Sequence, residues 1–300
     1  MIAGECEQQR PRPPVSLCLL KCKHSNQILQ IKCLRTVNRL PLQKRVQIIN
    51  LLVEGMSLRA TSRIADVSIN SVVKILVTVG RACQNFHNQK VKKIKAQTVQ
   101  CDEIWSFVYS KEKNTSEEQK GTGVGDVWTW VGIDPDTKLV ISWYIGNRSA
   151  DDAYIFMMDL KKRLANKVQL TTDGYRPYLN AVPDAFGSRI NFAMLVKLYD
   201  SKQRYIGAER RTIIGKPDKT KITTAHVERQ NLTMRMSMRR FTRESNGFSK
   251  KIENHCYAQA IHFVYYNFVR IHKTIRVTPA MEAGIAKEPL EIIDLVQLVD

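Results

Sequence analysis

Three acidic residues stand in local contexts that suit metal-dependent chemistry. Asp102 lies inside an apolar run, 99–108, Asp173 follows the shorter apolar run 168–172, and Glu228 opens a basic, helix-like segment. A carboxylate inside a strand is unfavourable unless its charge is compensated, and divalent metal ions can compensate it. Carboxylates on three separate elements of a mixed sheet-and-helix domain can converge on such ions. The pattern predicts phosphoryl transfer on nucleic acid, in which two metals clamp the attacking and leaving oxygens.

Magnesium, or manganese in its place, is the expected ion because carboxylate oxygens are its preferred protein ligands. Two ions about 4 Å apart would lower the pKa of an attacking water or 3′-hydroxyl and neutralise charge on the transferring phosphorus. We therefore expect Asp102, Asp173 and Glu228 to be both the catalytic residues and the metal ligands.

The helix that follows Glu228 offers cations at helical spacing. Arg235 and Arg239 come seven and eleven positions after Glu228, which puts all three on one face at 3.6 residues per turn. Both arginines are predicted to contact a DNA phosphodiester. The alternative is an amphipathic surface helix with solvated arginines.

Other acidic residues compete for the ligand positions. Glu103 neighbours Asp102 but is expected on the opposite face of the strand. Asp134 and Asp136 lie in a turn, where Asp is common for backbone reasons. Asp200 ends a later apolar run and is the strongest substitute for Glu228.

The charge of the chain is large and uneven. The net charge is +19, and residues 1–95 hold 17 Lys and Arg against 4 Asp and Glu, a difference of +13. So basic an N-terminal third favours a polyanionic partner such as nucleic acid. The alternative is a surface with surplus lysine.

Residues 42–82 show the periodicity of three helices, with Ser57 as a helix cap and Asp66 in a tight turn. Helix, turn and second helix are the parts of a helix-turn-helix. A plain three-helix packing unit is the alternative. The predicted DNA contacts in this region are Arg59, Arg63, Asn70, Ser71 and Lys74.

Beyond a lysine-rich linker, 90–95, the pattern changes to strands and helices. Strands are predicted over 98–109, 126–134, 138–146, 168–172 and 191–198. Helices are predicted over 149–166, 175–182 and from about 224, with loops at 112–125 and 202–224. Ser149 caps the first of these helices, whose apolar positions are Ile155, Met158, Leu160 and Leu164. Three leading strands followed by alternation is the order of a ribonuclease-H-like fold.

The predicted organisation of this α/β protein has four parts. A poorly defined basic segment covers 1–41, a helix-turn-helix domain with linker 42–95, a catalytic ribonuclease-H-like domain 96–285, and a tail 286–300. No run of 18 apolar residues exists, so no membrane span is expected, and we expect a cytoplasmic, nucleoid-associated protein. Seven scattered cysteines indicate reduced thiols. Zinc is not expected, because Cys18, Cys22, His24 and Cys33 lack the paired C-x2-C of structural sites.

Three blocks together resemble the catalytic blocks of the DDE transposases, most closely those of bacterial insertion sequences of the IS-one type. They are Gln100–Phe107, Thr172–Tyr175 and His226–Asn231. The family's Asp-Glu-x-Trp-x-Phe is matched at Asp102, Glu103, Trp105 and Phe107, and its basic residue seven after the Glu is matched by Arg235. The ending, Tyr266–Thr274 followed by Thr278-Pro279-Ala280, is also similar to the family's.

The resemblance implies DNA transposition. The protein would bind terminal inverted repeats through its helix-turn-helix, cut a strand at each end, and join the 3′-hydroxyl to target DNA. It would act as a homodimer or a higher oligomer on DNA. A ribonuclease-H-like nuclease that only cuts, and a decayed transposase that only binds DNA as a regulator, are the alternatives.

Overall fold

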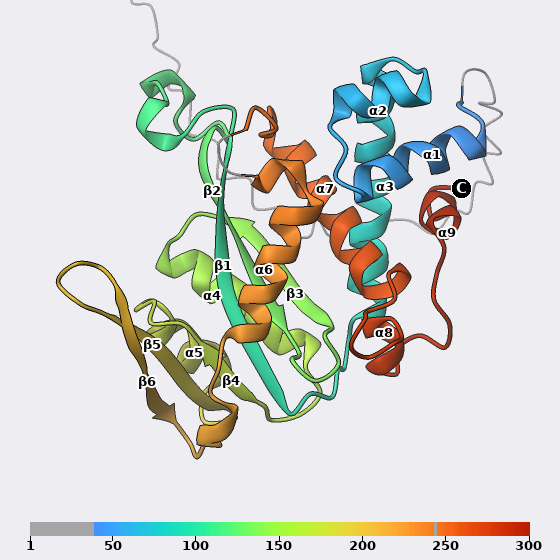
Figure 1. Cartoon of the computed structure of the whole chain (residues 1–300). Helices are drawn as coiled ribbons and strands as arrows, with labels where there is room; N and C mark the ends of the chain where they lie inside the picture. Colours follow the sequence, from blue (N-terminus) through green and yellow to red (C-terminus); the bar gives the residue numbers. More distant parts are fainter. Residues whose placement is uncertain (1–38, 243–244) are drawn as a thin grey trace, which may run out of the picture. The chain divides into compact units, whose positions relative to one another are not determined.

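The computed structural model describes residues 39–242 and 245–300 (Figure 1). Residues 40–300 form one compact unit. The candidate zinc residues and most of the predicted N-terminal segment lie outside the described residues. Among the described helices, none combines the length and the apolar character that a membrane span requires.

The centre of the chain is a six-stranded mixed sheet with the order β3-β2-β1-β4-β5-β6. The first three strands form an antiparallel meander, β4 and β5 run parallel to β1, and β6 returns antiparallel to β5. The strands are β1 (Thr98–Val108), β2 (Gly125–Ile133), β3 (Val140–Gly146), β4 (Gln169–Thr172), β5 (Asn191–Tyr199) and β6 (Tyr205–Ile214). The fold class predicted from the strand and helix order is confirmed.

Helices cover both faces of this sheet (Figure 1). They are α1 (Leu42–Val53), α2 (Leu58–Ala65), α3 (Ile69–Lys90), α4 (Ala150–Arg163), α5 (Tyr178–Phe186), α6 (Ala225–Ser237), α7 (Ile252–Val264), α8 (Pro279–Glu282) and α9 (Ile292–Gln297). Short helical turns are Glu112–Asn114, Glu117–Gln119, Lys219–Lys221, Arg239–Phe241 and the π-helical Tyr265–Val269.

Strand β1 lies inside the sheet, between β2 and β4, and side chains on both of its faces are buried. Cys101 belongs to the same apolar cluster as Phe156 and Leu160 of α4. Ile104, on the opposite face, clusters with Val227 and Met234 of α6. A long strand held between two helical layers is a rigid support for the acidic residues it carries.

Helix α4 begins as predicted, and its buried face matches the predicted one in part. Ser149 accepts the N–H of Asp152 as the N-cap. Ile155 is 46% exposed, whereas Phe156 and Met157 are fully buried. Of the predicted apolar positions, Leu160 is fully buried and Met158 and Leu164 are half-buried, so only Ile155 is wrong. More than one stripe fits a helical period, and packing against the sheet selects between them.

The segment 202–224 was predicted as a basic loop, and that prediction is wrong in part, because β6 occupies its middle. Most β6 residues are exposed and three consecutive ones, Glu209, Arg210 and Arg211, are charged. Charge on an edge strand hides the apolar alternation that identifies strands in a sequence. The backbone ladder with β5 forms the strand here.

The three predicted N-terminal helices are confirmed as α1, α2 and α3. Ser57 and Ser68 cap α2 and α3 by accepting backbone N–H groups, and Asp66 takes the left-handed conformation with φ 50° at the turn. Helix α3 runs on to Lys90 and packs along α7. A Cβ on Gly80 of α3 would collide with the Cβ of Tyr257 on α7, so glycine permits this contact.

The C-terminal segment also joins this packing. Leu295 and Val296 of α9 are buried, and α9 contacts α1. The Arg45 guanidinium lies 3.1 Å from the Asp300 carboxylate. The first and last helices of residues 40–300 therefore support each other beside α3.

Candidate metal centre and nucleic-acid contacts

The candidate metal centre lies where the short strand β4 ends beside the long strand β1. The last register pair of these strands is Cys101 with Thr172. Beyond it β1 continues for seven residues to Val108, with no described strand on that side. Asp173 directly follows Thr172, so it stands at this open edge next to Asp102 and Glu103. The end of β4 thus brings a third carboxylate to two on β1.

Asp102, Glu103 and Asp173 each offer a carboxylate oxygen, and these oxygens lie within 4.8 Å of one another. Asp102 and Asp173 were predicted to converge, and the structure brings them together. Glu103 was set aside because alternate residues of a strand face opposite sides. Because no strand closes the edge beyond Thr172, the longer Glu103 side chain approaches the other two carboxylates despite that alternation.

The surroundings of the cluster leave much of its negative charge uncompensated. Burial, followed by the charge of Asp173, raises the pKa of Asp102 to about 6, although Asn231 Nδ2 donates to its Oδ2 at 2.9 Å. Burial and then Asp173 raise the pKa of Glu103 to about 8. Burial also raises the pKa of Asp173, although the Tyr175 N–H, which donates to it at 3.0 Å, and nearby Arg148 each lower that pKa.

Arg148 is a functional candidate that the sequence reasoning missed. Its Nε lies 3.5 Å from Glu103 Oε1, and its guanidinium stacks on the rings of Trp128 and Tyr175 at 4.7 and 4.2 Å. The hydroxyl of Tyr175 in turn donates to the Arg148 carbonyl at 2.8 Å. An arginine in a turn gives no sequence signal for this role, because its partners come from three separate elements.

Glu228 stands beside the cluster and has a partner of its own. Its Oε1 lies 2.8 Å from Lys197 Nζ and accepts the Thr224 hydroxyl at 2.6 Å. It is not one of the three carboxylates that lie within 4.8 Å of one another. Its charge nevertheless contributes to the raised pKa of both Asp102 and Asp173. Glu228 therefore faces the same space from the first turn of α6, across from Lys197 on β5.

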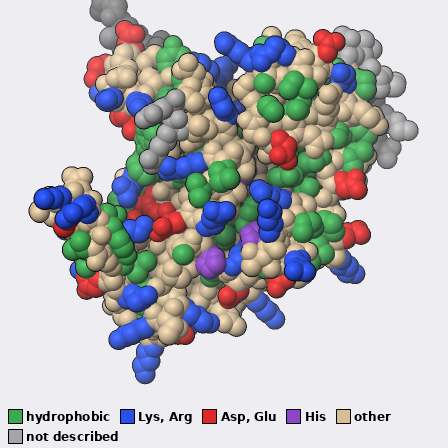
Figure 2. All heavy atoms as spheres, viewed as in Figure 1, with side chains coloured by type: hydrophobic (Ala, Val, Ile, Leu, Met, Phe, Trp, Pro, Cys, Tyr) green, Lys and Arg blue, Asp and Glu red, His purple; other side chains and the backbone are tan. Residues whose placement is uncertain are grey.

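The donor set fits a divalent cation. Hard cations prefer carboxylate oxygens, and Glu103 Oε2 is buried with no hydrogen-bond partner among the described residues. Burying several carboxylates together is costly unless a cation compensates them. Figure 2 shows acidic side chains gathered beside β1, with Lys and Arg side chains on either side.

The competing acidic residues have structural roles. Asp200 accepts the N–H groups of Lys202 and Arg204 in the β5–β6 turn, and its pKa is lowered, first by the Arg204 N–H. Asp134 is buried and accepts the Asp136 N–H at 2.9 Å and the Thr137 hydroxyl at 2.8 Å. Both carboxylates stabilise turns, so neither replaces Glu228.

Most of the candidate DNA contacts on the N-terminal helices are exposed. Arg59, Arg63, Asn70 and Lys74 are exposed, whereas Ser71 is half-buried. The Ser71 N–H donates to the Ser68 cap at 3.1 Å, and the two hydroxyls are 2.9 Å apart. Contact of these five residues with bases or phosphates stays a prediction. Ser71 already contacts Ser68 at the start of α3.

The predicted shared face of α6 does not extend to Arg239. Helix α6 ends at Ser237, and Met238 is extended, with φ −127° and ψ 108°. Arg239 starts a separate 3-10 turn, so the helical spacing that placed it beside Glu228 is wrong. Arg235 is half-buried in the last turn of α6, and its contact with a DNA phosphate stays a prediction. Arg239 instead lines a cavity beside α2.

Comparison with solved structures finds chains of the Mos1 transposase. A Mos1 paired-end complex with the left transposon end is 15% identical over 52% of this chain, with a TM-score of 0.23. A Mos1 mariner paired-end complex with Mn is 14% identical over 55%, with a TM-score of 0.22. The alignments cover 59% of each of those two chains. The Mos1 strand transfer complex is 14% identical over 76% of both chains, with a TM-score of 0.24. No protein-family model matches the sequence, and no curated protein matches it.

Proposed function

We propose that this protein is a metal-dependent polynucleotidyl transferase of the transposase type. It binds DNA ends, cuts a strand, and joins the new 3′-hydroxyl to another DNA. The observation that carries the proposal is the cluster of Asp102, Glu103 and Asp173 at the end of β4. The strand order of the sheet and the excess of basic residues support a nucleic-acid substrate.

Asp102 and Asp173 would hold the metal, with Glu103 or Glu228 as the third carboxylate. A bound divalent metal would supply Lewis-acid polarisation of the phosphoryl oxygens and a more acidic attacking hydroxyl. The chain's own groups orient the ligands. Asn231 fixes one oxygen of Asp102 through the 2.9 Å hydrogen bond, and the N–H of Tyr175 fixes one oxygen of Asp173 at 3.0 Å.

Lys197 would neutralise Glu228 until a metal or a phosphate enters. Its Nζ is 2.8 Å from Glu228 Oε1, and its side chain is 39% exposed. An exposed lysine can move away at little cost because surface ion pairs contribute about 0–1 kcal/mol. Glu228 can then turn toward the cluster, while Lys197 remains near enough to contact a phosphate.

The test is a strand-cutting and strand-joining assay with purified full-length protein, labelled DNA carrying the element's inverted repeats, and magnesium or manganese. We expect cut products and longer joined products that depend on the metal. Asp136→Asn, an exposed turn residue outside the cluster, should leave both reactions unchanged. Cutting without joining would identify a nuclease, and DNA binding with neither reaction would identify a DNA-binding regulator.

A further inference from the structure

A cavity of about 550 Å³ lies between the N-terminal helices and the segment that joins α6 to α7. It is separate from the carboxylates at the end of β4. Residues of α1, α2 and α3 border one side, and residues of the Arg239–Phe241 turn, the following loop and α7 border the other. Its size is that of a small-molecule or single-nucleotide site, since ligand pockets span roughly 300–1,000 Å³.

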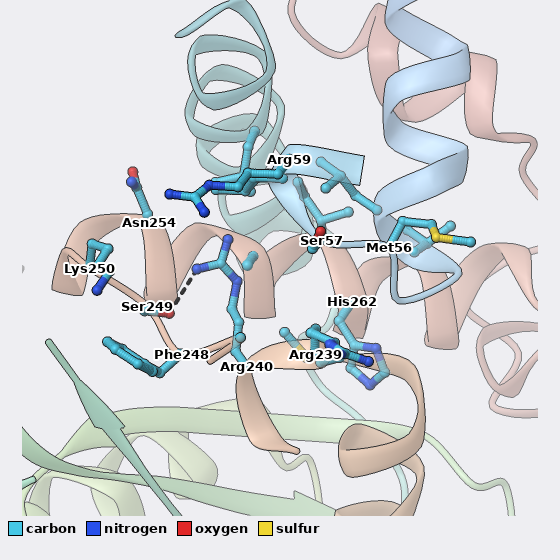
Figure 3. Close-up of a pocket in the computed structure, with 18 of the residues that line it drawn as sticks. Met56, Ser57, Arg59, Arg239, Arg240, Phe248, Ser249, Lys250, Asn254 and His262 are labelled. Carbon is cyan, nitrogen blue, oxygen red and sulfur yellow. Dashed lines mark hydrogen bonds between the residues drawn. The ribbon is translucent and has the colours of Figure 1, made fainter. Parts of the chain in front are cut away.

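Cations line this cavity from both sides. Arg59 comes from α2, Arg239 and Arg240 from the 3-10 turn, and Lys250 from the loop before α7. No Asp or Glu occurs among its described lining residues. Figure 3 shows the side chains of Arg59 and Arg240 entering the same space from opposite sides. Like charges that converge without an acid favour an anion between them.

Arg240 is the most constrained of these cations. Its Nη1 donates to Ser249 Oγ at 2.7 Å, and Ser249 in turn lies 2.9 Å from buried His255 Nδ1. Burial lowers the pKa of Arg240 to about 10, which leaves it charged at neutral pH. A guanidinium held in this way presents a fixed positive charge to the cavity.

Among the polar residues that line the cavity, one histidine is buried and has no hydrogen-bond partner within the described part of the chain. His262 of α7 is 4% exposed, and neither ring nitrogen has a hydrogen-bond partner among the described residues. Burial, and then Arg270, lowers its pKa to about 4, so the ring is neutral, with one N–H donor and one acceptor nitrogen. Leaving both ring nitrogens of His262 without a hydrogen bond is costly. A ligand that offers both a donor and an acceptor would satisfy them. The apolar lining residues include Leu52, Val53, Leu76, Ala258 and Ile261.

From these contacts we infer that the cavity receives one unpaired nucleotide of a DNA strand, with its base against His262 and its phosphates at Arg59 and Arg239. A base edge offers neighbouring donors and acceptors, and its ring fits the apolar lining. A paired duplex could reach the cations at the mouth but could not enter. This inference rests on the proposed function, because it takes DNA as the substrate.

The test is binding of full-length protein to a duplex that carries one extra 2-aminopurine nucleotide, against the same duplex fully paired. Chelator is present throughout, so catalysis does not contribute. We expect the bulged duplex to bind about tenfold more tightly than the paired one, which is the affinity gain expected from stacking one base. The 2-aminopurine fluorescence should also change on binding. Equal affinity for the two duplexes would overturn the inference while leaving the proposed function intact. Binding to neither duplex would count against both.

Two variants assign the preference to the cavity. His262→Leu should abolish the preference for the bulge without weakening binding of the paired duplex. It should also leave the thermal unfolding midpoint unchanged or higher, because it removes two unsatisfied polar atoms. Arg59→Ala should weaken the bulged duplex more than the paired one, whereas Lys162→Ala, an exposed cation of α4, should change neither. A preference that survives His262→Leu in folded protein would overturn the assignment.

Competition with a free nucleotide tests whether the cavity binds a nucleotide outside a DNA strand. Free dAMP is added in increasing concentration to the complex with the bulged duplex. If the cavity serves a nucleotide within a strand, millimolar dAMP should displace little of the bulged duplex. Displacement at micromolar dAMP would mean that the cavity is a mononucleotide site and would overturn the strand assignment.

Discussion

The carboxylate cluster and the cationic cavity both gather like charges, but they differ in spacing and support. The acidic oxygens of Asp102 and Glu103 inside β1 and of Asp173 at the end of β4 lie within 4.8 Å of one another. The cations of the cavity, among them Arg59 and Lys250, are spread over helices and loops around about 550 Å³. Close, rigid carboxylates suit a small multivalent cation, and dispersed cations suit an extended anion. On the proposed function, the first region would carry out the chemistry and the second would place the strand.

The largest expected effect is that of Asp173→Asn on the acidic region. Asparagine keeps an oxygen for the Tyr175 N–H but lowers the negative charge, so the fold should hold while metal binding fails. Strand cutting should fall by at least about 10²–10³-fold, the cost of removing one group that stabilises transition-state charge. Manganese should no longer raise the thermal unfolding midpoint. DNA affinity in chelator should not fall, because the cationic cavity and the N-terminal helices are untouched.

Activity of Asp173→Asn near that of the wild type would reject the metal mechanism. Loss of DNA binding along with activity would instead show that the two regions are not separable.

The next effect concerns Glu103, which decides whether the cluster has two or three protein ligands on the strands. Glu103→Gln removes the cost of burying this carboxyl, whose pKa burial and then Asp173 raise to about 8, and its repulsion with Asp102 and Asp173 when it is ionised. The metal-free protein should unfold at an equal or higher temperature, by up to about 2–4 °C for each kcal/mol of relieved repulsion. If Glu103 orients or binds the ion, manganese affinity should fall about 10–100-fold. Asp136→Asn is the matched control. If Glu103→Gln leaves the manganese affinity unchanged, Glu228 would be the third ligand.

The sequence predicted the elements well where local signals agree. Ser57, Ser149 and Asp66 marked helix starts and a turn, and apolar runs marked five of the six strands. It also placed Asp102 and Asp173 together, because each ends or interrupts such a run.

What the sequence could not predict depends on contacts between distant residues. Glu103 joins the cluster only because β4 stops at Thr172, and a strand length set by tertiary pairing leaves no local trace. Arg239 leaves the α6 face because the helix ends one turn early, although no proline or glycine marks that point. The cavity around His262 needs α2 and α7 to meet, which no periodicity specifies.

Arg235 and Arg239 test whether the carboxylate cluster and the cationic cavity act separately. They were predicted to act alike, and the structure places them in different regions. Arg235→Ala in the last turn of α6 should lower cutting and joining about tenfold, the effect of losing one hydrogen bond to a charged phosphate. Metal-induced stabilisation should be unchanged. Arg239→Ala should spare the chemistry of a paired substrate and reduce the preference for the bulged duplex.

Arg235→Lys separates charge from geometry in the same assay. It should recover part of the activity if only charge is needed, and little if the contact is bidentate. Arg229→Ala, an exposed arginine on another side of α6, is the matched control. If Arg235→Ala retains wild-type cutting, the idea that this arginine holds the substrate is wrong.

The smallest expected effect is that of Lys74, an exposed cation on α3 that belongs to neither region. If α3 enters a DNA groove, Lys74→Ala should weaken binding of paired and bulged duplexes equally, by a few-fold. The dependence of log affinity on log salt should become shallower by about one unit, because one phosphate contact no longer releases a counterion. Binding measured at several salt concentrations, with Lys162→Ala in parallel, checks this. A loss confined to the bulged duplex would assign Lys74 to the cavity, and an unchanged salt slope would remove α3 from the DNA interface.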